Sequence, residues 1–208
     1  MARVSFTAAS AELARRDRVM RALVKRHGPC RIPRSTDDHF YALAESIVYQ
    51  QLAGAAAAAI FKRFRGLYDG ALTPEAVLRT REEKLRGAGL SPNKMASIRD
   101  LAAKVKDGTL PLDRLSRLRD EQIIERLVTV RGIGRWTAEM FLIFQLRRGD
   151  VWPVDDYGVR KGYASAYALI ELPKPKELFV LGERFRPHRT VAAWYCWRAV
   201  DTATPGGT

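Results

Sequence analysis

Apolar side chains recur along this chain mainly at the three- and four-residue spacing of amphipathic α-helices. The predicted helices cover about residues 10–26, 39–64, 92–106, 112–118, 120–129, 136–147, 176–183 and 190–202, with one more starting at Pro74 and another running from Asp155 or Asp156 to 169. Thr73–Pro74 and Ser91–Pro92 have the sequence of an N-cap followed by proline in the first helical turn. No strand-like alternation is long enough to build a sheet, so we expect an all-α fold.

Two glycines, Gly132 and Gly134, separate two of these predicted helices. Glycine permits a positive φ and a close approach of the backbone to another molecule. The free N–H groups at the start of the following helix can bind a phosphate. A glycine pair alone is more typical of an ordinary corner between helices, but basic residues surround this one and favour the phosphate site. They are Arg131, Arg135, Arg147, Arg148, Arg160 and Lys161.

The chain as a whole is strongly basic. Its 208 residues carry a formal net charge of +13, and 47% of them are apolar, as in a globular protein. Such a charge favours nucleic acid as the partner, with a ribosome-associated or merely soluble basic protein as the alternative. Two distant cysteines predict no disulfide framework, zinc site or iron–sulfur cluster. No apolar run is long enough for a membrane span, so we expect a cytoplasmic protein that does not bind membranes.

Four stretches of the chain carry a specific resemblance. GIGRWTAEM followed by DVWPVDDYGVRKG resembles the helix-hairpin-helix Gly/Pro/Asp superfamily of DNA glycosylases, most closely its 3-methyladenine DNA glycosylase II branch. The other matching stretches are SIVYQQLAGAAAAAI (46–60), GLSPNKMASIRDLAAKVKDG (89–108) and FRPHRTVAAWYCWR (185–198). The resemblance covers about residues 37–200, and it is to the compact, all-helical members that lack an additional N-terminal β-rich domain.

This resemblance implies a two-lobed helical fold with the active-site cleft between the lobes. It also implies a monomer that acts on double-stranded DNA containing damaged bases. We expect a single domain, 1–208, whose central lobe (about 39–170) contains the hairpin at 130–134. The N-terminal helix and about residues 171–203 are expected to form the second lobe.

An acidic pair, Asp155–Asp156, stands at the start of a predicted helix. Either residue could be a simple N-cap, and we assign that role to Asp155. By resemblance, Asp156 matches the catalytic aspartate of the superfamily. Breaking an N-glycosidic bond builds positive charge on the deoxyribose, and a fixed carboxylate stabilises that charge while it orients or deprotonates the attacking water.

Aromatic residues are the expected base pocket. Trp136 and Trp197 match pocket positions of the superfamily, Tyr157 is a third candidate, and their faces suit a cationic alkylated base. Trp136 also occupies the position at which lyase members carry a Schiff-base lysine, so the resemblance implies hydrolysis without strand cleavage. Core packing is an equal alternative for Trp136, and it is our preferred interpretation for Trp152 and Trp194.

The remaining expected contacts concern DNA and a cation. Two adjacent amides, Gln50 and Gln51, cannot both face a helical core, so at least one should reach a surface or cleft. By resemblance, Gln51 fills the gap that a flipped base leaves in the duplex. A solvated glutamine is the alternative. The expected DNA contacts are Gln50, Gln51, Gly132, Gly134, Arg135, Thr137, Arg160 and Lys161. The backbone carbonyls of Val128, Val130 and Ile133 are candidate ligands for a monovalent cation, as in some relatives, and no other cofactor is expected. Arg131 stands where many relatives have proline, which adds charge but removes rigidity.

Together these expectations describe a type II DNA-3-methyladenine glycosylase without lyase activity. It would flip alkylated purines, such as 3-methyladenine and 7-methylguanine, and leave an abasic site in base excision repair. Two alternatives stay open: a hypoxanthine-excising glycosylase, and a non-catalytic helix-hairpin-helix DNA-binding protein. Asp156 argues against the second alternative, because a pure binder gains nothing from a carboxylate near phosphates.

Overall fold

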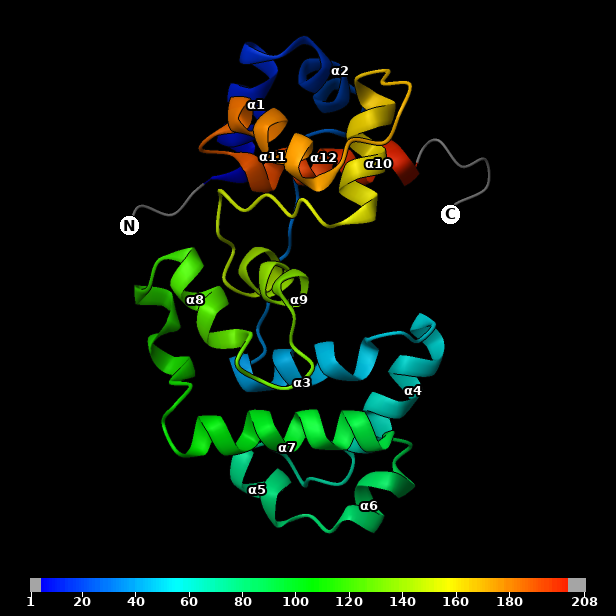
Figure 1. The fold of residues 1–208 in the computed structure, drawn as a ribbon, viewed down its shortest axis with the longest axis vertical. Coiled ribbons are helices and arrows are strands. Elements are labelled where there is room, and N and C mark those ends of the chain that lie inside the picture. Colours follow the sequence, from blue (N-terminus) through cyan, green and yellow to red (C-terminus); the bar gives the residue numbers. More distant parts are fainter. Residues whose placement is uncertain (1–4, 202–208) are drawn as a thin grey trace. The chain divides into compact units, whose positions relative to one another are not determined.

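The computed structural model describes residues 5–201, and within that range every regular element is a helix and no strand is present (Figure 1). The all-α prediction is therefore confirmed. The elements are α1 (Phe6–Arg16), α2 (Arg18–His27), α3 (His39–Tyr49), α4 (Gly54–Arg65), α5 (Pro74–Arg79), α6 (Glu82–Gly87), α7 (Pro92–Lys106), η1 (Leu112–Arg117), α8 (Asp120–Leu127), α9 (Arg135–Met140), η2 (Phe141–Gln145), α10 (Tyr157–Ala166), α11 (Pro175–Gly182), η3 (Glu183–Phe185) and α12 (Arg189–Asp201). None of the helices in the described range has the length and apolarity needed to cross a membrane.

The chain divides into two compact units. One unit contains residues 35–141, and the other combines 1–34 with 142–208, of which 5–34 and 142–201 are described. The lobe expected to contain the hairpin included 142–170, whereas in the structure these residues group with the two terminal segments. The reason is that α10 packs along α12 more extensively than any other pair of elements.

The unit of residues 35–141 is built around α7. Helices α3, α5 and α6 all pack against α7, and α4 packs on α3. Ile98 and Leu101 of α7 are fully buried, as is Leu43 of α3. Burying side chains of this kind contributes roughly 1.5–3 kcal/mol each relative to exposure. The predicted N-caps are confirmed, since the side chains of Thr73 and Ser91 accept backbone N–H groups of α5 and α7.

The second unit pairs α1 with α2 and α10 with α12. The single helix predicted for 10–26 is wrong, because the chain breaks at Asp17, whose φ of −137° is extended. The Asp17 carboxylate accepts the N–H groups of Val19 and Met20 at 2.8 and 2.9 Å, and so caps a new helix. The side chains of Met20 and Leu13 are buried in the core of this unit.

The long helix predicted for 39–64 is also two helices. Between α3 and α4 the chain turns through Gln50–Ala53, where Gln51 has a φ of +56°. A positive φ is uncommon for a residue other than glycine and marks a special position in the fold. The break therefore falls on the glutamine pair that was expected to contact DNA.

Candidate active site

The glycine turn at 130–134 connects α8 to α9 and is held in place by α7. Gly132 has a φ of +78°, and a Cβ atom there would lie 2.6 Å from Ser97 Oγ. Both conformation and packing therefore require glycine at this position. Ile133 between the two glycines is 4% exposed, so its side chain anchors the turn in the core.

Asp100 of α7 fixes the first residue of this turn. Its Oδ2 accepts the backbone N–H of Arg131 at 2.7 Å, and its Oδ1 contacts Lys104 Nζ at 2.5 Å. Partial burial raises the pKa of Asp100, but the hydrogen bonds from Lys104 and from the Arg131 amide outweigh it and hold this pKa below its usual value. Proline has no N–H group to donate here. Arg131 thus replaces the rigidity of a proline with a hydrogen bond to α7.

Gln50 and Gln51 have different roles. Gln50 Nε2 donates to the carbonyl of Gly132 at 2.9 Å and to Thr137 Oγ1 at 3.4 Å. This amide therefore braces the glycine turn from inside its own unit, a role that was not predicted from the sequence. Gln51 is exposed at its positive φ, which fits a side chain presented to another molecule.

Gly134 differs from Gly132 because nothing in the fold requires it to be glycine. Its φ is −91°, and a Cβ atom there would meet no other atom within 4 Å. Gly134 is the N-cap of α9, whose first backbone hydrogen bond runs from Ala138 N–H to Gly134 O at 3.1 Å. This first bond leaves the N-terminal end of α9 pointing outward, and the open space at Gly134 suits a phosphate there.

The other predicted DNA contacts have varied surroundings. Arg135 binds Glu121 through two hydrogen bonds of 2.7 and 2.9 Å, and these, more than its contact with Glu139, raise the pKa of its guanidinium. Thr137 is only 6% exposed. Arg160 Nε donates to the carbonyl of Pro173 at 2.9 Å, and Lys161 is exposed. Of these four residues, Arg135 and Lys161 are exposed, whereas Arg160 is half-buried.

The proposed cation ligands lie in the same turn. The carbonyl of Val130 accepts the N–H of Ile133 at 3.0 Å, and a carbonyl oxygen keeps a second lone pair beyond one such bond. Neutral carbonyl oxygens suit a hard monovalent cation. The cation site at Val128, Val130 and Ile133 stays a prediction.

Asp156 lies in the other unit, at the start of α10, and is 8% exposed. Its Oδ1 accepts the N–H of Val159 at 2.7 Å and the indole Nε1–H of Trp197 at 2.9 Å. The assignment of the N-cap to Asp155 is wrong: Asp155 is exposed, and Asp156 itself caps the helix. Two N–H donors and the positive end of the helix dipole stabilise negative charge on this carboxylate.

An aromatic pair adjoins the carboxylate. The ring of Phe144 stacks on Trp197, with centroids 5.8 Å apart and planes at 24°. A Cβ atom at Gly158 would lie 2.8 Å from Trp197 Cδ1 and 3.1 Å from Asp156 Oδ1. Glycine at 158 therefore leaves room for the indole to reach the carboxylate.

Phe144 is a candidate site residue that was not predicted from the sequence. The helix predicted for 136–147 and expected to be buried is instead the short α9 followed by η2, a π-helical turn. Phe144 lies in that turn and is 43% exposed. A π turn shifts the side chains that follow it out of the normal helical register and is frequent at functional sites. The apolar run FLIF is the only sequence signal, and it looks the same as that of a buried helix.

Three of the four tryptophans divide between core and surface. Trp152 and Trp194 are 5% and 8% exposed, which confirms the core assignment for both. Trp136 is 46% exposed and Tyr157 is 64% exposed. A pocket role for Trp136 and Tyr157 stays a prediction, and their exposure is compatible with it.

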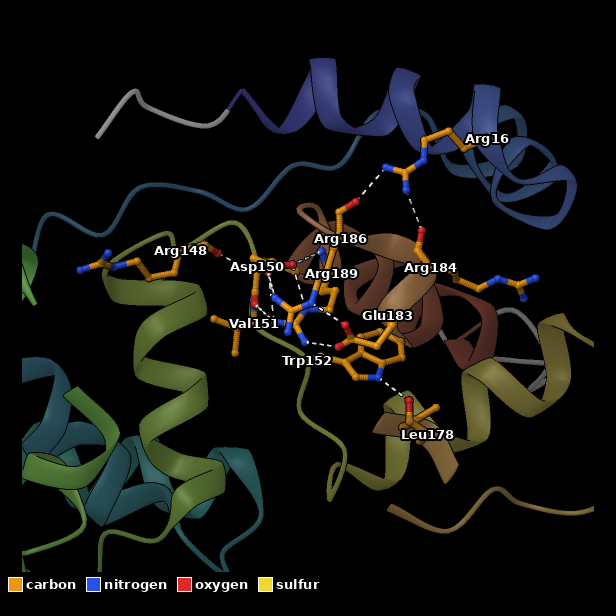
Figure 2. A network of polar contacts seen from close by, with 11 residues as sticks. Arg16, Arg148, Asp150, Val151, Trp152, Leu178, Glu183, Arg184, Arg186 and Arg189 are labelled. Carbon is orange, nitrogen blue, oxygen red and sulfur yellow. Dashed lines mark hydrogen bonds and ion pairs between the residues drawn. The ribbon is translucent and has the colours of Figure 1, made fainter. Parts of the chain in front are cut away.

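The segment that leads to Asp156 is held by a polar network (Figure 2). Asp150 is bound by Arg189 through Nε at 2.8 Å and Nη2 at 3.0 Å, and by Arg186 at 2.7 Å. The neighbouring contacts run from Val151 N–H to Thr190 Oγ1, from Thr190 Oγ1–H to the Arg148 carbonyl, and from Trp152 Nε1–H to the Leu178 carbonyl. Paired arginine–carboxylate contacts are geometrically strict, so this network fixes the approach of the chain to α10.

Charge at Asp156 also affects Cys196 of α12. Burial, and secondarily the negative charge of Asp156, raise the pKa of the Cys196 thiol. The sulfur is therefore protonated at neutral pH and unsuited to act as a nucleophile. The described residues contain no group of three or more histidine, cysteine, aspartate or glutamate side chains that could hold a metal ion. Asp156 is thus the one buried carboxylate beside exposed aromatic faces in the described part of this unit.

Comparison with known proteins agrees with this arrangement. A family model described as "HhH-GPD superfamily base excision DNA repair protein" matches residues 44–187. The chain belongs to this superfamily. Among curated HhH-GPD relatives, DNA-3-methyladenine glycosylase 1 of Schizosaccharomyces pombe is 37% identical over 204 residues, which cover 96% of this chain and 90% of the relative.

Two solved structures of such relatives match most of the chain. The S. pombe 3-methyladenine DNA glycosylase Mag1, in complex with abasic DNA, has 36% identity and a TM-score of 0.81, covering 92% of this chain and 96% of that one. A DNA-3-methyladenine glycosidase from Bacillus halodurans has 35% identity and a TM-score of 0.86, covering 98% and 94%. The resemblance inferred from the sequence motifs is therefore confirmed at the level of the family and the fold.

Proposed function

We propose that this chain is a DNA glycosylase that hydrolyses the N-glycosidic bond of alkylated purines in double-stranded DNA and leaves an abasic site. The observation that carries the proposal is the buried Asp156 carboxylate, which receives two N–H donors beside the stacked Trp197 and Phe144. The names of the S. pombe and B. halodurans relatives support 3-methyladenine as a substrate. We also propose that the protein acts as a monomer, in the cytoplasm.

The chemistry follows from where positive charge develops. As the bond to the base breaks, the deoxyribose becomes oxocarbenium-like, and a fixed carboxylate stabilises it without reorganising. The Asp156 Oδ1 atom accepts the Val159 N–H and the Trp197 Nε1–H, which fixes the position of the carboxylate. The same carboxylate can orient the attacking water or take its proton. Alkylation gives the purine a positive charge, so the base leaves readily without a dedicated general acid.

Selectivity is proposed to come from the aromatic surfaces. The base must leave the duplex before it can react, and a cationic purine stacks on electron-rich rings better than a neutral one. Trp197, Phe144 and Tyr157 belong to the same unit as Asp156. We assign Trp136 to base or DNA contact on the basis of its exposed face. A second candidate substrate is hypoxanthine, a neutral purine that would stack on the same rings without the advantage of a positive charge.

We propose that the enzyme has no lyase activity. Lyase members of the superfamily attack the sugar with a lysine two positions after the second glycine of the hairpin, and this chain has Trp136 there. An indole has no nucleophilic amine. The expected product is an intact strand that carries an abasic site.

The substrate proposal is tested with two duplexes, one methylated and one containing hypoxanthine. We expect release of 3-methyladenine and 7-methylguanine, with strand breaks that appear only after alkali treatment. Release of base from the hypoxanthine duplex alone would mean that the substrate is a deaminated purine and not an alkylated one. Absence of release from both duplexes, with DNA binding intact, would contradict the enzymatic proposal. Strand breaks without alkali, together with a covalent enzyme–DNA adduct formed in the presence of borohydride, would contradict hydrolysis as the only reaction.

The two glycines of the turn provide a test of the phosphate site. Gly134→Ala adds a methyl group into open space, so we expect wild-type thermal stability but about tenfold weaker binding to duplex DNA, equivalent to roughly 1.4 kcal/mol. Gly132→Ala is the matched control, and it should lower the free energy of unfolding by roughly 1–3 kcal/mol because of its positive φ and the contact with Ser97. Wild-type DNA affinity in Gly134→Ala would rule out this backbone as the phosphate site.

A further inference from the structure

We propose that Lys94 of α7 is a positioning residue for base extrusion, because it holds the turn that presents Gln51 to the DNA. This turn, Gln50–Ala53, joins α3 to α4, and the side chain of Gln51 is exposed on it. Lys94 Nζ donates a hydrogen bond to the backbone carbonyl of Val48 at 2.7 Å, shortly before the turn. The proposal rests on the proposed function, in which a base must leave the duplex before it reacts.

The Lys94 ammonium takes the place of a helical donor at the end of α3. If α3 continued, the N–H of Leu52 would donate to the carbonyl of Val48, four positions earlier. Instead, the Leu52 N–H donates to the carbonyl of Tyr49 at 3.4 Å, and the Val48 carbonyl accepts Lys94. The last carbonyls of a helix need such partners, and a cation at this end also agrees with the helix dipole. The contact therefore satisfies the end of α3 where the chain leaves the helix.

Lys94 is itself fixed by the helix that carries it. Its backbone N–H donates to Ser91 Oγ at 3.3 Å in the first turn of α7, and α7 packs against α3 (Figure 1). The side chain is half-buried, and burial lowers the pKa of the ammonium. Within residues 5–201 no carboxylate is paired with this ammonium. Lys94 thus bonds a neutral carbonyl at the end of α3 rather than an acidic side chain.

The position of Gln51 depends on the residues just before it. The chain is fixed at Val48 by Lys94 and at Gln50 by the carbonyl of Gly132, which accepts Gln50 Nε2 at 2.9 Å. Gln51 follows with a φ of +56°. The next helix, α4, begins at an N-cap that provides no side-chain hydrogen bond. A side chain that enters a duplex needs supporting contacts that hold it in place, and here those contacts are made ahead of Gln51.

The test compares a paired lesion with a mismatched one. We expect Lys94→Met to slow single-turnover release of 7-methylguanine opposite cytosine about tenfold, as for the loss of one hydrogen bond to a charged group. Opposite thymine, the variant should react within about twofold of wild type, because a mismatched base costs less to extrude. Lys94→Arg keeps a cationic N–H donor and should restore most of the rate on the paired lesion. The control, Lys106→Met, removes the same charge from an exposed position of α7 and should match wild type on both duplexes.

Two other roles of Lys94 would give different results. If Lys94 only stabilised the fold, Lys94→Met would slow release from both duplexes alike, and this result would overturn the proposal. If Lys94 bound a DNA phosphate directly, the slope of log affinity against log salt concentration would fall by about 1, which would overturn it as well. We expect an unchanged slope.

A double variant tests whether Lys94 acts through Gln51. Gln51→Gly removes the side chain and tolerates the positive φ. Adding Lys94→Met to it should slow release no further, because both changes then affect a single step. Losses that add fully in the double variant would contradict action through Gln51.

A binding measurement tests the same role without base release. The probe is a duplex with 2-aminopurine opposite an abasic site, since this base fluoresces more strongly when it loses its stacked neighbours. We expect saturating wild-type protein to raise the fluorescence, and Lys94→Met to raise it less although it binds the duplex. Equal fluorescence in the two complexes would overturn the role of Lys94. If wild type releases no methylated base but the fluorescence difference is present, the proposed function fails while the positioning of Gln51 by Lys94 is supported.

Discussion

Replacing Asp156 with asparagine is expected to abolish base release while the fold and the DNA affinity remain. Asparagine keeps an Oδ1 acceptor, so the bonds from Val159 N–H at 2.7 Å and Trp197 Nε1–H at 2.9 Å can persist. The change removes the negative charge and replaces the second carboxylate oxygen by an amide NH₂ group. Removing one preorganised electrostatic group from an active site typically slows the reaction by about 10²–10³-fold, and we expect at least that loss in the single-turnover rate of methylpurine release.

The matched control for this change is Asp155→Asn. Asp155 is exposed and is not the cap of α10, so its amide variant should release methylpurine at the wild-type rate. A gel-shift measurement on abasic DNA shows whether Asp156→Asn still binds. Loss of release in Asp155→Asn with activity kept in Asp156→Asn would reverse the assignment of the catalytic residue.

Local signals predicted the helices that begin with a clear cap. Thr73–Pro74 and Ser91–Pro92 start α5 and α7 as expected, because an N-cap depends only on neighbouring backbone. The break between α3 and α4 was not predictable in the same way. Its sequence is rich in helix-forming alanine, but Gln50 bonds to Gly132, 82 positions later in the chain. A tertiary contact of this kind overrides local propensity and leaves no local signal.

In the candidate site too, residues that stand in sequence motifs were predicted, and features that depend on three-dimensional geometry were not. The aspartate, the glycine pair and Trp197 were identified because they stand in motifs that resemble the family. The helix cap was assigned to the wrong residue, since two adjacent aspartates have the same capping ability until the residue at which the helix begins is known. Phe144 was missed because the π turn that exposes it has the composition of a buried helix.

Substituting Gly162 with alanine is expected to destabilise the fold more than Gly132→Ala does. A Cβ atom at this position would lie 1.8 Å from the carbonyl oxygen of Cys196 and 2.8 Å from its Cα. Both are backbone atoms, so no side-chain rotation relieves the overlap and α10 must move away from α12. We expect the free energy of unfolding to fall by roughly 3 kcal/mol or more, at the upper end of overpacking effects.

Urea unfolding measures this loss, and Gly87→Ala is the control. Gly87 lies at the end of α6, where an added Cβ meets no atom within 4 Å, so that variant should match or slightly exceed wild-type stability. Equal stability of the two variants would contradict the close contact of α10 with α12. Under the proposed mechanism the same contact also affects catalysis, because Asp156 caps α10 and α12 carries Trp197. Separating the two helices draws the indole N–H away from the carboxylate, so folded Gly162→Ala should also release methylpurine more slowly than Gly87→Ala.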